Sequence, residues 1–76
     1  MNKQTRITIK AISVKLTEIT KELKEFREEE QRKYLRLSPG LQNSPRAHGL
    51  LEARMNLIIA ASYIEEAVKY LGMATK

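Results

Sequence analysis

Two prolines near the middle of the chain constrain its fold most, because they stand between two long stretches with helical apolar spacing. The residue before Pro39 is pushed out of the α-helical region, and Gly40 permits a change of direction, so a helix that reaches Ser38 ends there. Ser44 followed by Pro45 is typical of a helix start, since the serine side chain can accept a bond from a free N–H group and proline at the first position loses none. The sequence therefore predicts two helices joined by a turn.

Both stretches carry apolar residues at alternating steps of three and four, which places them on one face of an α-helix. In the first stretch the predicted stripe is Ile9, Ile12, Leu16, Ile19, Leu23 and Phe26. In the second it is Leu50, Ala53, Leu57, Ala60, Ile64, Ala67 and Leu71, with Ala61 and Val68 beside it.

We predict helices over about residues 5–36 and 45–71, a turn over 37–44, and an end of the second helix at Gly72 in the left-handed conformation. A connection this short makes the helices antiparallel neighbours. The expected fold is thus an all-α antiparallel two-helix hairpin that occupies residues 1–76 as one domain.

The second helix has a further apolar patch on another face, formed by Leu51, Met55, Ile58 and Ile59. The opposing residues 27–33 are mostly charged and cannot cover it. A domain this small buries only about 60% of its unfolded surface, and a chain without cysteine has no disulfide to add stability. We therefore expect the patch to bind a second copy, giving a helical bundle, or a partner protein. In the alternative, the turn residues Tyr34, Leu35, Leu37 and Leu41 fold back over the patch.

One polar contact between the helices is also expected. Glu30 lies on the apolar stripe of the first helix, and antiparallel pairing places it opposite Arg54. A carboxylate in that position needs a partner. An ion pair between the two would add little net stability but would fix the register of the helices; in the alternative, Glu30 is simply solvated.

The positive charge is concentrated at the N-terminal end of this chain of net charge +5. Four cations precede the first acid, Glu18: Lys3, Arg6, Lys10 and Lys15. Arg6, Lys10 and Lys15 are therefore candidate nucleic-acid contacts. Residues 6–10 also alternate between polar and β-branched side chains, as in the basic strand of ribbon-helix-helix repressors, although the helix that follows is longer than in those folds. In the alternative, the charges only keep the chain in solution.

The sequence contains few of the residues and motifs that carry out catalysis. There is a single histidine, His48, no cysteine, no aspartate, no glycine-rich phosphate loop and no metal-ligand spacing. We expect no enzyme activity, no cofactor and no metal. The longest apolar run, residues 57–61, is far short of the roughly 20 residues of a membrane span, so a cytoplasmic protein is expected. A weaker alternative is an oligomeric trap for a small molecule or nucleotide, with a pocket containing Arg54 and Tyr63.

A set of residues on both sides of the turn resembles a known group of proteins. They are Glu28-Glu29-Glu30-Gln31, Tyr34, Pro39, Leu41-Gln42, Ser44, Arg46-Ala47, Ala53, Leu57, Ala60, Ile64-Glu65-Glu66-Ala67 and Tyr70-Leu71. The pattern, over residues 16–71, resembles small uncharacterised helical-hairpin proteins of bacteriophages, prophages and related mobile elements. The resemblance implies a mobile-element origin and an accessory role. We expect a phage-type accessory protein in a bacterial host cell that acts by binding, for example as an inhibitor of a host or defence factor. The resemblance implies no catalytic residues.

Overall fold

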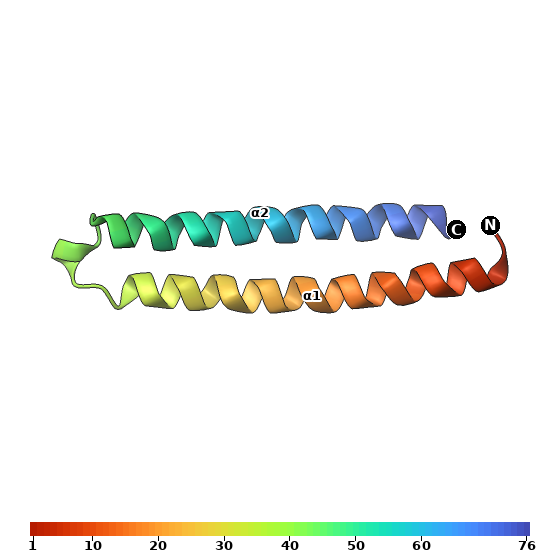
Figure 1. Ribbon diagram of the computed structural model, residues 1–76, viewed down its shortest axis with the longest axis horizontal. Helices are drawn as coiled ribbons and strands as arrows, with labels where there is room; N and C mark the ends of the chain where they lie inside the picture. Colours follow the sequence, from red (N-terminus) through yellow and green to blue (C-terminus); the bar gives the residue numbers. More distant parts are fainter.

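The computed structural model describes all 76 residues and shows two long antiparallel helices joined at one end (Figure 1). Helix α1 spans Lys3–Leu35, a short 3-10 helix η1 spans Pro39–Leu41, and α2 spans Pro45–Ala74. The molecule measures 59 × 14 × 12 Å, with both termini at the end opposite the turn. The predicted all-α helical hairpin is therefore confirmed.

Each helix begins at a polar side chain that caps it. The Oδ1 atom of Asn2 accepts a hydrogen bond from the N–H of Thr5 at 2.8 Å, and Oγ of Ser44 accepts one from the N–H of Ala47 at 3.2 Å. Both caps satisfy N–H groups that have no partner inside the helix. The cap at Ser44 was predicted, whereas the one at Asn2 was missed and moves the start of α1 two residues toward the N-terminus.

The predicted end of α2 at Gly72 is wrong. The helix continues to Ala74, and no glycine in the chain has a positive φ. Thr75 ends the helix instead: its hydroxyl donates to the carbonyl oxygens of Leu71 at 2.9 Å and Gly72 at 3.3 Å. A side chain thus satisfies carbonyls that a left-handed glycine would otherwise have helped to satisfy.

Residues 6–10, whose alternation is also typical of the basic strand of ribbon-helix-helix proteins, lie inside α1, as the predicted helix over about residues 5–36 requires. Five alternating residues are too short a pattern to outweigh a helical pattern that continues to the turn. The ribbon-helix-helix interpretation consequently loses the strand on which it depended.

The two helices face each other through residues that repeat with alternating steps of three and four. In α1 and the turn, the buried or half-buried residues at this spacing are Ile9, Ser13, Leu16, Thr20, Leu23, Arg27, Glu30, Tyr34 and Leu37. In α2 and its cap they are Ala47, Leu50, Arg54, Leu57, Ala61, Ile64, Val68, Leu71 and Thr75. This is the seven-residue repeat of an antiparallel coiled coil.

The sides of α1 and α2 that face each other are rotated about the helix axes relative to the predicted apolar stripes. Ile12 and Ile19 are each 44% exposed and Phe26 is 55% exposed, so half of the predicted α1 stripe does not face α2. On α2, Ala61 is buried and Ala60 is exposed, the reverse of the prediction. The apolar arc of each helix is wider than a single neighbouring helix can cover, so only one edge of it is used within the hairpin.

The interior of the hairpin is correspondingly thin. Only four of the 76 residues are buried, namely Thr20, Ala47, Ala61 and Thr75, and none of them is a large apolar residue. Burial of large apolar side chains is the main favourable term in folding. One hairpin alone therefore has very little core to offset the entropy of ordering 63 helical residues.

Candidate interaction surfaces

One side of the groove between the helices is polar, and two contacts define it. Nζ of Lys24 lies 2.6 Å from Oε1 of Glu65, and Nε of Arg54 donates to Oε1 of Gln31 at 3.0 Å. As α1 advances from Lys24 to Gln31, the partner on α2 moves back from Glu65 to Arg54, which gives the antiparallel register. We call this side the polar flank.

The expected contact between Glu30 and Arg54 is not formed. Oε1 of Glu30 accepts from Nζ of Lys33 at 3.0 Å, one turn along the same helix, and Arg54 bonds to the neighbouring Gln31. The predicted pairing of the helices is right to within one residue. However, Glu30 and Arg54 each bind another residue, and the polar contact between the helices here is the charge-assisted hydrogen bond from Arg54 to Gln31.

The opposite side of the groove is apolar, and its position follows from helix geometry. Each residue turns an α-helix by about 100°, so residues on either side of an inward-facing position lie on opposite flanks. Lys24 and Glu65 each follow an inward residue and meet on the polar flank. Residues that precede inward positions therefore lie on the other flank, and those that precede Ser13, Thr20 and Arg27 in α1 and Arg54, Ala61 and Val68 in α2 lie nearest the groove. They are Ile12, Ile19 and Phe26 from α1 and Ala53, Ala60 and Ala67 from α2.

We call these six residues the apolar flank. Its six members are uncharged over three successive repeats, and its large side chains come from α1 and its small ones from α2. Lys15, Glu22 and Glu29, which precede Leu16, Leu23 and Glu30, lie further around α1 on the same side. The apolar flank ends toward the turn at Lys33, whose ammonium group is paired with Glu30. Sequence reasoning grouped these residues with the inner stripes, because apolar spacing shows which face of a helix is apolar but not which neighbour covers it.

A second apolar surface winds around α2 from Leu51, beside the groove, to the side away from α1 at Ile59. Leu51, Met55 and Ile59 are 39%, 54% and 44% exposed, and Tyr63, one step of four further on, is 70% exposed. We call these four residues the outer stripe. Ile58, which was predicted to belong with them, is half-buried beside the groove.

The turn does not cover this surface. Leu35 is 63% exposed and Leu41 is 52% exposed, so neither folds back over α2. The turn is held by its own contacts: the hydroxyl of Ser44 donates to the Leu41 carbonyl at 2.6 Å, and the Gln42 amide donates to the Leu37 carbonyl at 3.4 Å.

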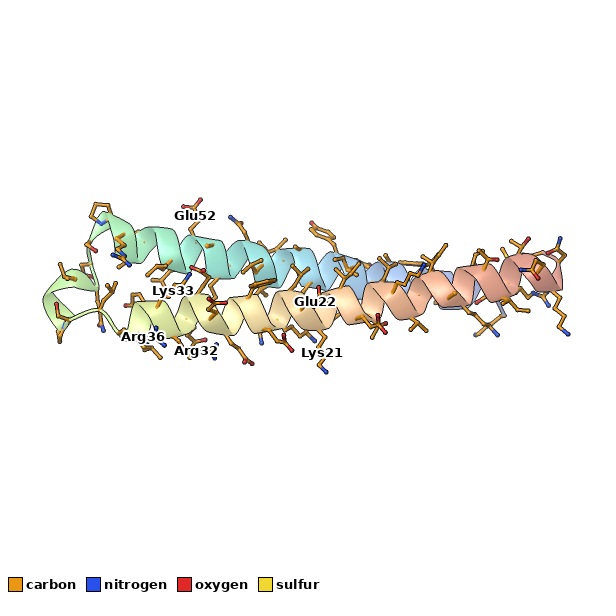
Figure 2. All side chains as sticks on the ribbon, turned by 60° about the horizontal axis from the view of Figure 1, so that its bottom comes forward. Lys21, Glu22, Arg32, Lys33, Arg36 and Glu52 are labelled. Atoms are coloured by element: carbon orange, nitrogen blue, oxygen red, sulfur yellow. The ribbon has the colours of Figure 1, made fainter.

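Charged side chains occupy the outer edges of the hairpin. Figure 2 shows Lys21 and Arg32 projecting from α1 and Glu52 from α2, each away from the other helix, whereas Lys33 lies between the helices. At the N-terminal end, Arg6, Lys10 and Lys15 are all exposed on α1. Lys3, Arg6 and Lys10 are spaced by three and four residues and therefore share one face.

A hollow of about 300 Å³ on the polar flank is lined by Thr17, Thr20, Lys21, Lys24, Glu65 and Val68, and its Lys24 and Glu65 already pair with each other. Arg54 and Tyr63 are nine residues apart on α2, which places them on opposite sides of it. A trap that used both would need a second chain.

No group of three metal-ligating side chains lies close enough together to hold an ion, and His48 is exposed at the start of α2. Neither helix has an apolar stretch long enough to cross a membrane.

Comparison with known protein families, curated proteins and solved structures finds no match to this chain.

Proposed function

We propose that this protein acts by binding another protein and carries out no catalysis, with the outer stripe of α2 as its docking surface. The observation that carries the proposal is the exposed row of Leu51, Met55, Ile59 and Tyr63 on a helix that is already packed on its other side. A helix that is apolar on more than one face is usually buried on more than one face. The role we propose is that of a phage-type accessory protein in the bacterial cytoplasm, which inhibits a host or defence factor.

The geometry of the outer stripe favours a helical or grooved partner. Residues four apart form a ridge that crosses the helix obliquely, turning by about 40° at each step. Such ridges pack into the grooves of another helix at a crossing angle of about −50°. Amphipathic helices also insert rows of this kind into apolar grooves as anchors.

The acids around the stripe suggest the chemistry of the rim. Glu52 and Glu66 are exposed and lie seven residues on either side of Ile59, on the same line along the helix. An apolar groove edged with lysine or arginine would therefore match the stripe, and these charges would raise the rate of encounter more than the affinity.

Photo-crosslinking in bacterial cells tests the proposal. A benzoylphenylalanine at position 63 is expected to give an adduct with a protein other than a second copy, and the substitutions Met55→Lys and Ile59→Lys together should abolish it. The same probe at Lys21, which is exposed on α1 away from the outer stripe, serves as the matched control. An identical set of adducts from positions 63 and 21, or an adduct that survives the two lysines, would contradict the proposal.

Nucleic-acid binding is a second candidate, because four exposed cations on the first four turns of α1 precede any acid. Phosphate contacts of this kind give an affinity that falls steeply with salt. If they exist, the affinity for a fluorescent 20-base-pair duplex should fall with rising salt. Replacing Arg6 and Lys10 by alanine should flatten that dependence by roughly two units of slope. An intact protein that does not change the fluorescence anisotropy at low salt has no such function.

A further inference from the structure

We propose that two copies of this chain pair through the apolar flank into a four-helix bundle, with α1 of each copy lying antiparallel along α2 of the other and both turns at the same end. This surface is distinct from the outer stripe. The proposal is therefore independent of the partner suggested above.

The first argument is that exposed apolar residues of α1 and α2 lie on the same flank of the hairpin. In α1 the inward residues alternate between large apolar side chains, such as Leu16 and Leu23, and polar ones, such as Ser13 and Thr20. Three of the exposed large side chains of α1, Ile12, Ile19 and Phe26, lie on the apolar flank, while Ile7 and Val14 lie on another side of the helix. In α2 the alanines Ala60 and Ala67 extend the arc to that same flank. Both helices thus present apolar side chains on the same flank of the hairpin.

The second argument is size complementarity. A two-fold axis parallel to the helices leaves the position of each residue along the bundle unchanged. The register set by Lys24 with Glu65 and by Gln31 with Arg54 therefore also applies between copies. It places Phe26 of one copy at the level of Ala60 of the other. Ile19 reaches the level of Ala67 and Ile12 that of Ala74. Each large side chain of α1 thereby meets a small residue of α2, as close packing requires.

The third argument is area. A face 59 Å long and 14 Å wide amounts to about 800 Å² per copy, which is the size of a standard stable protein interface. The apolar flank, which extends about 21 Å from Ile12 to Phe26, would form the uncharged centre of this face. It is bordered by Glu22 and Glu29 on α1 and by Lys33, which is paired to Glu30. A second copy would also supply the core that the four buried residues of one hairpin do not provide.

The alternative two-fold arrangement places the turns at opposite ends. It would pair α1 with α1 of the other copy and α2 with α2. The large side chains Ile19 and Phe26 would then face large side chains, and the alanines would face alanines. Spacing between helix axes depends on side-chain size, about 8 to 10 Å, so one pair of helices would be held apart while the other needed to approach closely. The same-end arrangement has no such conflict.

Oligomeric state gives the first test. Light scattering at micromolar concentration is expected to give twice the chain mass of 8.8 kDa. Ile19→Lys should raise the dissociation constant at least about tenfold, because it would bury an unpaired charge. Val14→Lys is the matched control: Val14 is exposed on α1 but lies about 140° around the helix from Ile19, and its replacement should leave the dimer intact. A monomeric parent protein would overturn the proposal.

A size swap keeps the test decisive if the lysine variant fails to fold. Phe26→Ala alone and Ala60→Phe alone should each weaken the dimer, whereas the two together exchange the large and small partners and should restore most of it. Both positions are exposed in the single hairpin, so each variant is compatible with the fold. A double variant no better than the weaker single one would contradict the proposed contact.

The orientation has its own measurement. The chain contains no cysteine, and a side chain at Gly40 meets nothing within 4 Å, so Gly40→Cys can carry a spin label at the turn. Turns at the same end should give a label-to-label distance of about 15 to 30 Å, given helix axes about 10 Å apart. A distance near the 59 Å length of the molecule would overturn the same-end arrangement.

Discussion

Thr20 shows how polar side chains limit the contact between the two helices. It is one of the four buried residues, and its hydroxyl donates to the Leu16 carbonyl at 3.0 Å, so its polar group is satisfied. That carbonyl is one turn back along the same helix, and the hydrogen bond adds nothing across the interface. Thr20 therefore fills space in the interface without contributing the apolar area that a valine would.

Thr20→Val is expected to raise the free energy of unfolding by about 0.5 to 1 kcal/mol, because it replaces a locally bonded hydroxyl by a buried methyl group of similar size. Thr17→Val is the matched control. Its hydroxyl makes the same bond to the Ser13 carbonyl at 3.0 Å, but the residue is exposed, so the change should be near zero. Chemical denaturation of both variants measures the difference. Equal effects would show that the gain comes from helix propensity and owes nothing to burial.

The presence and approximate bounds of the two helices could be predicted from the sequence. Which side of each helix faces the other could not. The prolines and Ser44 determine where helices end and begin, and these are local effects of backbone geometry. The choice between Ala60 and Ala61 as the inward residue depends on how many neighbours share the apolar arc, which no local pattern contains. The same reason explains why Ile19 was predicted to lie inside the hairpin and is exposed.

The candidate surfaces divide in the same way. Leu51, Met55 and Ile59 could be picked out because they are apolar on a second face of α2. The apolar flank could not, since it becomes visible only when the contact between Lys24 and Glu65 shows which sides of the two helices meet.

Gly72→Ala tests the corrected end of α2. Gly72 is helical, has no positive φ, and has open space where a methyl group would be added. Alanine should therefore stabilise the protein by about 0.5 to 1 kcal/mol, the usual gain in a helix interior. A loss of stability in thermal unfolding would instead indicate the left-handed helix end that the sequence suggested.

For the molecule as a whole, a thin core makes stability depend on association. If the folded state is a pair of hairpins and the unfolded state is single chains, mass action favours folding as the concentration rises. The melting temperature should then increase over a hundredfold rise in protein concentration, by several degrees for a domain of this size. Ile19→Lys should show a lower melting temperature with little concentration dependence. A parent melting temperature that is independent of concentration would point to a self-sufficient monomer.

The position of the turn also determines the order in which the hairpin forms. Contacts beside Pro39–Leu41 close loops of about ten residues, while those between the two ends of the chain close loops of more than sixty, and the entropy cost grows with the logarithm of loop length. Folding should begin at the turn and spread along the helices toward the termini. Amide hydrogens near the turn should then exchange with solvent more slowly than those near Lys3 and Ala74, where opening the hairpin starts.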